Sequence, residues 1–362
     1  MRVLLSTVLL LLQSSTLYAK EACINNFNKQ ICREFEILNS VIVKSSLTKM
    51  ELKNKLNKPI TQIAFLGEFG LFLIDANNSL AYAQKLTEDE FIIYAQPNIS
   101  QKKEVNSNKE AIRLVQADKQ QHSLRNIWKT TKGKGIKIAI IDDGFNLAHE
   151  DLKNVDVTFS YDVNIKELNS KPKVKIDKHG TQVAGIIFSQ HNGIGNDGIA
   201  PEASLIAIRQ TTNITSDVIL AFTVADKSRA DIINCSWNSP LLLEPVYDII
   251  TYLIEKGRNN KGMAIVFSAG NDGKKLKPYS TEASIPEVIT VGSFQKHSNN
   301  GEMVDFIMQS NVNTTKYNGS YGKFGGTSAT APIISGYIAL EMSRSPDLSL
   351  NEIIKNVGSI IK

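Results

Sequence analysis

The sequence predicts an α/β protein whose larger part is a mainly parallel β-sheet with helices on both faces, a three-layer α/β/α arrangement. Short apolar runs rich in branched residues recur at residues 137–141, 204–208, 231–235, 264–267 and 288–291. Such runs are typical of strands that are covered on both faces. Helical patterns lie between them, at residues 217–230 and 246–256. This alternation favours a parallel sheet whose functional site lies at the carboxyl ends of the strands.

A small α+β module is predicted before this sheet, with its core at about residues 40–98. Strand and helix patterns alternate there in the order βαββαβ, at residues 41–43, 46–57, 61–66, 71–76, 78–86 and 91–95. Segments in which every second residue is apolar predict the strands, and segments in which apolar residues recur about every 3.6 positions predict the helices. This order is the ferredoxin-like arrangement. The whole N-terminal module is expected to span residues 20–100.

The remaining segments predict a leader and a linker. Residues 1–19 have the layout of a secretory signal, with an apolar run after Arg2 and small Ala19 before the expected cut. We therefore expect an exported protein, periplasmic or extracellular, and no later run is long enough to span a membrane. Residues 101–118 are polar and without periodicity, which indicates a cleavable linker. The main domain would then occupy residues 119–362.

Charge and cysteine content argue against several classes of protein. The net charge of +5 over 362 residues is modest and dispersed, which is not typical of a nucleic-acid-binding protein. Cys23 and Cys32 lie in a polar segment expected outside the core, where they could pair or remain free. Cys235 lies in an apolar run and is expected to be a small buried hydrophobe. No Cys/His spacing indicates zinc.

A serine after a glycine-rich turn is a candidate nucleophile. Ser328 follows Gly325 and Gly326 and opens an apolar helical run over residues 329–342. Its hydroxyl would lie at a helix N-terminus, where free backbone N–H groups stabilise an oxyanion. An ordinary helix-capping serine has the same pattern. The interpretation therefore depends on a base and an orienting acid elsewhere in the chain.

Three polar residues at predicted strand and helix ends complete this chemistry. Asp142 follows the strand at residues 137–141 and could orient an imidazole. His179 begins a helix of small residues and could act as the base. Asn271 follows another strand, and its amide could donate to an oxyanion. A turn role is the alternative for Asp142 and Asn271.

Four motifs resemble those of the subtilisin-like serine peptidases, or subtilases. They are Ile140-Ile-Asp-Asp-Gly144, His179-Gly-Thr-Gln-Val-Ala-Gly185, Ser268-Ala-Gly-Asn271 and Gly326-Thr-Ser-Ala-Thr-Ala-Pro332. The resemblance covers residues 120–362. It implies peptide-bond hydrolysis through an acyl-enzyme, with Ser328 as nucleophile, His179 as general base and Asp142 as orienting acid. It also implies that Asn271 donates to the oxyanion and that the chemistry needs no cofactor.

The resemblance further implies residues that bind substrate, namely Asp143, Ser236, Trp237, Asn238 and Gly270. The Asp142-Asp143 and Ser236-Trp237 pairs resemble the kexin/furin branch, in which the second aspartate lines the pocket for P2, the second substrate residue before the cut. We therefore expect Asp143 to face the cleft and to favour Lys or Arg at P2. Asn238 replaces a common glycine and could narrow the entrance of the pocket for P1 or alter the pairing with the substrate backbone.

A structural calcium site is a further implication of the resemblance. Asp151, Asn192, Ile194 and Asn196 correspond to positions whose oxygen atoms complete the tight calcium site of the family, and such oxygens suit calcium. Asp151 could instead cap a helix or turn.

Residues 91–98 resemble the end of the inhibitory prodomain of the family. The expected function is thus an exported serine endopeptidase, made as a self-processing zymogen whose prodomain is an intramolecular inhibitor. Its other partners would be protein or peptide substrates, with no nucleic acid and no membrane span. The alternative is a catalytically silent binding protein that keeps the fold.

Overall fold

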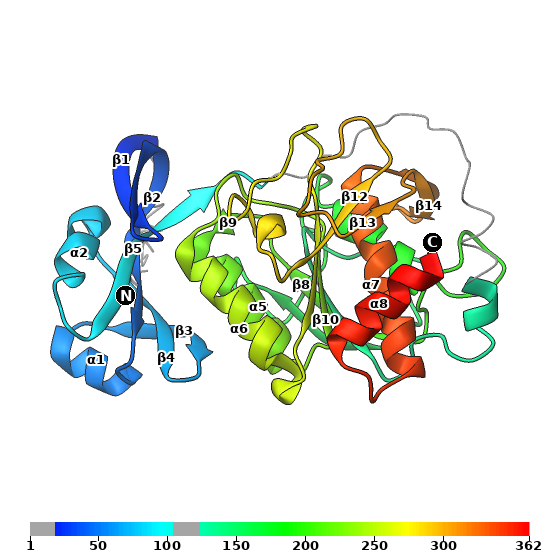
Figure 1. Ribbon diagram of the computed structural model, residues 1–362, viewed down its shortest axis with the longest axis horizontal. Helices are drawn as coiled ribbons and strands as arrows, with labels where there is room; N and C mark the ends of the chain where they lie inside the picture. Colours follow the sequence, from blue (N-terminus) through cyan, green and yellow to red (C-terminus); the bar gives the residue numbers. More distant parts are fainter. Residues whose placement is uncertain (1–18, 104–123, 362) are drawn as a thin grey trace, which may run out of the picture.

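The structure is a computed structural model, and it describes residues 19–103 and 124–361. Figure 1 shows two units beside each other, an N-terminal unit (residues 19–103) and a main unit (residues 124–361). Most of the predicted leader and of the predicted linker lies outside the described residues. Ala19 is the exception in the leader, because it begins the first strand.

The main unit is built on seven strands that pair in parallel, in the spatial order β13-β12-β11-β10-β6-β8-β7. These strands are β6 (Lys137–Asp142), β7 (Val157–Asp162), β8 (Ser204–Arg209), β10 (Ile232–Cys235), β11 (Ala264–Ser268), β12 (Ile289–Ser293) and β13 (Phe306–Met308). The five strands predicted from branched apolar runs are all present. The predicted parallel sheet is therefore confirmed.

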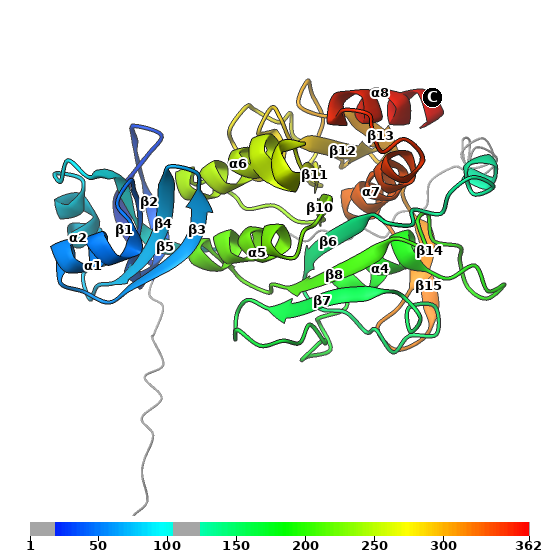
Figure 2. The same ribbon diagram turned by 90° about the horizontal axis from the view of Figure 1, so that it is seen from below.

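Helices cover both faces of this sheet, as Figure 2 shows. One face carries α4 (His179–Phe188), α7 (Thr327–Arg344) and α8 (Leu350–Ile361), and the other carries α5 (Thr215–Lys227) and α6 (Glu244–Asn260). Successive residues of β6 point to opposite faces, as strand geometry requires. Ile140 packs in the cluster that contains α7, and Ile141 packs in the cluster that contains α5 and α6. Three layers result.

The N-terminal unit is a second, antiparallel sheet in the order β3-β4-β2-β5, with β1 on the other part of β2. Its elements are β1 (Ala19–Asn26), β2 (Lys29–Ser45), α1 (Lys49–Leu56), β3 (Ile60–Leu66), β4 (Phe69–Asp75), α2 (Ser79–Leu86) and β5 (Ile92–Gln101). Leu52 of α1 and Ala83 of α2 pack on its outer face. Ile42 and Leu71 share one buried cluster with Phe222 and Leu253 of the main unit. The inner face is therefore buried against α5 and α6.

A strand of the main unit extends the N-terminal sheet. Strand β9 (Asn213–Ile214) pairs antiparallel with the end of β5, Ser100 opposite Ile214 and Gln101 opposite Asn213. Figure 1 shows β5 reaching from its own sheet to the main unit at this point. Backbone pairing thus joins the two units beside the carboxyl ends of the parallel strands.

The segment around the first two cysteines is not outside the core, so that prediction is wrong. Strands β1 and β2 form a hairpin with Ile24 and Phe35 buried. Cys23 and Cys32 are directly opposite each other and form a disulfide. Within residues 29–39 of β2 only Phe35 is fully buried, so the sequence carries too little apolar alternation to reveal this strand.

A further hairpin, which the sequence did not predict, leads into the serine helix. It consists of β14 (Val312–Thr315) and β15 (Tyr321–Phe324), followed by α7. Thr314 and Thr315 of β14 donate from their hydroxyls to carbonyls at the start of α4. The serine helix and the histidine helix are therefore tied together. Within residues 19–103 and 124–361, no helix is long and apolar enough to cross a membrane.

Candidate active site

Asp142 and His179 form a buried pair at the carboxyl edge of the parallel sheet. Asp142 is the last residue of β6 and His179 the first residue of α4. Nδ1 of His179 lies 2.9 Å from each oxygen of the Asp142 carboxylate. The two residues are 0% and 5% exposed. A carboxylate in this position fixes the imidazole with its proton on Nδ1, which leaves Nε2 to act as a base.

Each partner stabilises the charge of the other. Burial opposes ionisation of Asp142, but the imidazole and the Lys103 ammonium outweigh it and hold the pKa of this carboxyl below its usual range. Burial likewise disfavours protonated His179, but the charge and the hydrogen bond of Asp142 outweigh it and raise the pKa of the imidazole. The pair is therefore suited to accept a proton during a reaction.

Ser328 lies in the first turn of α7, as the sequence predicted, and is 1% exposed. Its hydroxyl donates to the carbonyl oxygen of Ser236 at 3.0 Å. Nε2 of His179 is buried and has no hydrogen-bond partner. The serine and the histidine are thus not hydrogen-bonded to each other here. A rotation of the serine side chain would be needed to join them.

Asn271 lies beside the start of the serine helix. Its side-chain oxygen Oδ1 accepts from the backbone N–H of Thr327 at 2.9 Å. This contact fixes the amide, so that Nδ2 is the atom able to donate to an oxyanion. Gly270 has φ of +97°, and a Cβ there would lie 2.5 Å from Asn299. A glycine is therefore required next to Asn271.

The Asp143 carboxylate contacts the helix that carries the histidine. It accepts from the backbone N–H groups of Lys178, His179 and Gly180, at 3.0, 3.0 and 2.8 Å. These are free N–H groups of the first turn of α4, which an anion stabilises. Burial and the neighbouring charge of Asp142 raise the pKa of Asp143 to about 6. The sequence prediction of a free side chain facing the cleft missed these contacts.

The other predicted substrate-binding residues lie at the end of β10. Ser236 donates from its hydroxyl to the carbonyl of Ser328 at 3.0 Å. Trp237 is fully buried, with its indole N–H on the carbonyl of Ile141 at 2.8 Å. Asn238 donates from Nδ2 to the carbonyl of Ser268 at 2.7 Å. Asn238 thus links the segment after β10 to the end of β11. The sequence analysis did not predict this contact, and expected Asn238 to act on the substrate pocket.

A lysine of the N-terminal unit reaches this site, which the sequence did not predict. Lys103 donates from Nζ to the carbonyl of Gln210 at 2.6 Å, and its ammonium lies 5.1 Å from the centre of the Trp237 ring. Burial lowers its pKa, and the charges of Asp142 and Asp143 oppose that shift. The chain that follows β5 therefore ends, among the described residues, beside the buried aspartates.

A buried arginine holds the loop that precedes His179, and it too was not predicted. Arg209, at the end of β8, contacts Asp162 at 2.7 Å and Asp177 at 2.6 Å. Oδ2 of Asp177 also accepts from the backbone N–H of Lys173 at 2.9 Å. Arg209, Asp162 and Asp177 are far apart in the sequence, so no local pattern reveals this cluster.

Two of the four predicted calcium ligands keep a side-chain oxygen to which no donor is bound. Oδ2 of Asp151 and Oδ1 of Asn196 are buried without hydrogen-bond partners, and uncompensated oxygens of this kind suit calcium. The Asn192 side chain does not fit, because its Nδ2 donates to Asp151 at 2.8 Å and its Oδ1 accepts from Ile194 N–H at 2.9 Å. The described ranges contain no cluster of three or more His, Cys, Asp or Glu side chains that could hold a metal.

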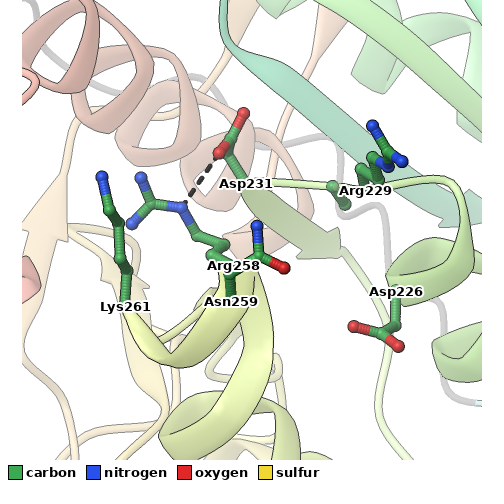
Figure 3. A pocket seen from close by; sticks show the side chains of 7 residues that line it. Asp226, Arg229, Asp231, Arg258, Asn259 and Lys261 are labelled. Atoms are coloured by element: carbon green, nitrogen blue, oxygen red, sulfur yellow. Dashed lines mark hydrogen bonds and ion pairs between the residues drawn. The ribbon is translucent and has the colours of Figure 1, made fainter.

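A separate pocket of about 250 Å³ lies at the amino end of β10 and is lined mainly by charged side chains from the ends of α5 and α6 and the residues that follow them, as Figure 3 shows. Nε of Arg258 bonds the Asp231 carboxylate there at 2.9 Å. None of the residues that line it belongs to the predicted site. This pocket is at the opposite edge of the sheet from Asp142.

The main unit is similar to known proteins over most of its length. Residues 133–357 match the Subtilase family. A protein from Trichormus variabilis named calcium-dependent protease is 29% identical, over 62% of this chain and 41% of its own length. The major intracellular serine protease of Bacillus subtilis is 31% identical, over 66% of this chain and 76% of its own length. The chain thus spans about two fifths of the first relative.

A solved structure shares the fold over most of the chain. Fervidolysin from Fervidobacterium pennivorans, described as a keratinolytic enzyme related to subtilisin, gives a TM-score of 0.70 at 19% identity. The match covers 88% of this chain and 56% of that structure. At this level of identity the likeness concerns the architecture alone.

We predict that Asp143→Asn changes how stability depends on pH. Because the folded-state pKa of Asp143 is raised from 3.8 to about 6, the folded protein binds this proton more tightly than the unfolded chain. The contribution of this group to stability is then present at low pH and is lost as the pH rises from about 4 to 6. In that window, wild type should lose about 2–3 kcal/mol relative to Asp143→Asn.

The measurement is urea unfolding of both proteins between pH 4 and pH 7, each also carrying Ser328→Ala to prevent digestion. A constant difference between them across this range would show that Asp143 does not titrate in this way.

Proposed function

Because the chain belongs to the subtilase family, we propose that it is a serine endopeptidase that hydrolyses peptide bonds with Asp142, His179 and Ser328. The observation that carries the proposal is the buried contact of 2.9 Å between Asp142 and Nδ1 of His179. This contact lies at the same edge of the sheet as Ser328, which begins α7. A catalytically silent binding protein is the alternative, but it would have no need of a buried, charge-stabilised imidazole.

The first step is attack by the Ser328 hydroxyl on a substrate carbonyl. The hydroxyl now donates to the Ser236 carbonyl. It must give up this hydrogen bond and turn to Nε2 of His179. His179 then takes the proton as Oγ forms a bond to the carbonyl carbon, and Asp142 stabilises the resulting imidazolium. The same proton is given to the leaving amine, which produces the acyl-enzyme that water later hydrolyses.

The oxyanion formed in that step would be stabilised by two donors. One is Nδ2 of Asn271, since the other end of this amide is held by Thr327 N–H. The second is the backbone N–H of Ser328, in the first turn of α7, where the helix itself supplies no acceptor. Preorganised donors of this kind are worth about 3–4 kcal/mol each in such enzymes.

The N-terminal unit is proposed to be an intramolecular inhibitor of a self-processing zymogen. Support comes from the end of β5, which pairs with β9 as an extended substrate would and continues to Lys103 beside Asp142. A segment bound there excludes other peptides from the cleft. Protein or peptide substrates would follow the same path once this segment has left.

Lys103 also supports the proposed preference for a basic residue at P2. The charge of Asp143, which would line the pocket for that substrate residue, acts on this ammonium and opposes the lowering of its pKa. The three backbone contacts of Asp143 use part of its accepting capacity and leave further lone pairs. Because a single charge pair contributes little to affinity, the preference should be only a fewfold.

Export and calcium binding are proposed on separate grounds. The leader predicted at residues 1–19 and the disulfide between Cys23 and Cys32 favour an oxidising compartment, periplasmic or extracellular. Asp151 and Asn196, with their unpartnered oxygens, are the side chains that would hold a structural calcium ion. A backbone carbonyl such as that of Ile194 could complete it. The ion would stabilise the fold, and no step of the chemistry needs it.

The experiment that tests the peptidase proposal compares Asn271→Ala and Ser328→Ala with wild type on a peptide substrate. Asn271→Ala should lower kcat by about 100- to 1000-fold with little change in KM, because the oxyanion exists only in the transition state. Ser328→Ala should abolish acyl-enzyme formation. A loss below fivefold for Asn271→Ala would reduce this residue to a turn position, and an active Ser328→Ala would remove the proposed nucleophile.

A prediction about processing concerns the same serine variant. Ser328→Ala should accumulate as a precursor of residues 20–362, because the enzyme itself is expected to cut the linker. Mass spectrometry of protein from a host without comparable proteases makes the test. Recovery of mature-sized Ser328→Ala would show that another protease makes the cut.

The P2 preference is tested with Asp143→Ser, which removes the carboxylate. Wild type should cleave a peptide library with a fewfold preference for Lys or Arg at P2, and Asp143→Ser should lose that preference. Identical P2 profiles for the two enzymes would exclude Asp143 from substrate selection.

Calcium binding predicts a metal-dependent melting temperature. In the Ser328→Ala protein, EDTA should lower Tm by roughly 5–10 °C, since an ion at 100 times its Kd contributes about 2.7 kcal/mol. Asp151→Asn should melt at the same temperature with and without EDTA. Equal Tm values for the parent protein with EDTA and with calcium would contradict the site.

A further inference from the structure

The tip of the β1–β2 hairpin contacts the start of α6 in the main unit. Asn26 is only 3% exposed there. Its Nδ2 donates to the carbonyl of Leu242 at 3.0 Å, and its Oδ1 accepts from the backbone N–H of Glu244 at 2.8 Å. One side chain of the N-terminal unit therefore satisfies both a donor and an acceptor of the main unit.

Helix α6 cannot satisfy that N–H group by itself. Its N-cap residue is Leu243, which has no side-chain acceptor, and no side-chain cap is formed within the main unit. Asparagine is among the strongest capping side chains, and Asn26 supplies the missing oxygen from the other unit. The contact is reciprocal, because Glu244 accepts from the backbone N–H of Phe27 at 3.1 Å.

Aromatic packing surrounds these hydrogen bonds. The ring of Phe27 lies edge-on to Tyr247 with centroids 5.4 Å apart, and Tyr247 lies in the same manner against Tyr279 at 5.9 Å. A cavity of about 550 Å³ between the hairpin and the main unit is lined by these three rings and by Ile31 and Leu241. This surface is thus both apolar and provided with specific polar contacts, as ligand sites usually are.

The tip is held in the shape that fits this surface. Phe27 and Asn28 both have positive φ, of 51° and 56°, which is unfavourable for phenylalanine and must be imposed by its surroundings. The disulfide of Cys23 and Cys32 closes the hairpin three residues from the end of each strand. Gln96 also holds the tip, by donating to the carbonyl of Asn25 at 2.6 Å. Such preorganisation lowers the entropic cost of binding.

We propose that the start of α6, with Tyr247 and Tyr279, is a second binding site of the main unit, separate from the substrate cleft. Its ligand is the disulfide-closed tip of the N-terminal hairpin. The site slows release of the N-terminal unit after the linker has been cut, and reduction of the disulfide weakens it. The inference extends the inhibitor role proposed above, but it does not require that the protein be catalytically active.

The test uses the full chain with Ser328→Ala and with a recognition sequence for an unrelated, site-specific protease inserted in the linker. After that protease has cut the linker, the dissociation rate of the N-terminal fragment from the immobilised main unit is measured. Asn26→Ala should dissociate about tenfold faster, as expected for the loss of two buried hydrogen bonds. Asn25→Ala is the matched control, because this neighbouring side chain is exposed. It should dissociate at the parent rate.

Two further measurements separate the contact from the folding of the hairpin. Tyr247→Ala changes only the main unit and should also accelerate dissociation. Dithiothreitol, added to the parent protein, should accelerate dissociation as much as replacement of both Cys23 and Cys32 by serine does. Parent rates for both Asn26→Ala and Tyr247→Ala would overturn the second site. Because every protein in this test lacks Ser328, the result is independent of whether the chain is a peptidase.

Discussion

The burial of the Asp142 carboxylate beside His179 is the constraint on which the main unit depends. A buried anion is costly unless a partner offsets it, and the imidazole at 2.9 Å is that partner. The contact requires β6 to end and α4 to begin at one edge of the sheet. Two residues hold the start of α4 in place. Arg209 binds Asp177 in the loop before His179, and Asp143 accepts from the first N–H groups of α4. The charged groups around the histidine therefore form one connected structure.

The two units of the chain complete each other at the same edge. Helices α5 and α6 begin after Ile214 and Leu243, neither of which can cap a helix with its side chain. The N-terminal unit supplies the missing oxygens, from Asn98 to the N–H of Ser216 at 3.1 Å and from Asn26 to the N–H of Glu244. Removal of the N-terminal unit would expose both helix ends and the apolar surface that its sheet covers. Water would have to replace these contacts, which is why we regard the N-terminal unit as a tight intramolecular ligand.

Local patterns in the sequence were sufficient for the five central strands of the parallel sheet and for Asp142 at its carboxyl edge, but not for the outer strands β7 and β13. Branched apolar runs identify strands such as β6, and the residue that follows each run must lie at the edge, as Asp142 does. The hairpin of β1 and β2 was missed because the charged Arg33 lies on the same face of β2 as Phe35 and interrupts its apolar pattern, although the guanidinium lies over the Phe35 ring. Arg209 and Lys103 were missed for another reason. Their partners are distant in sequence, and only the folded chain brings buried charges of this kind together.

The central claim is that the buried pair of Asp142 and His179 makes Ser328 a nucleophile. Its most direct test is reaction of the processed protein with a fluorophosphonate, followed by mass spectrometry of the labelled peptide. The account predicts one adduct, on Ser328, that forms far more slowly after His179→Ala, since Nε2 can then no longer take the proton. Labelling at another residue, or labelling at an equal rate without His179, would contradict it.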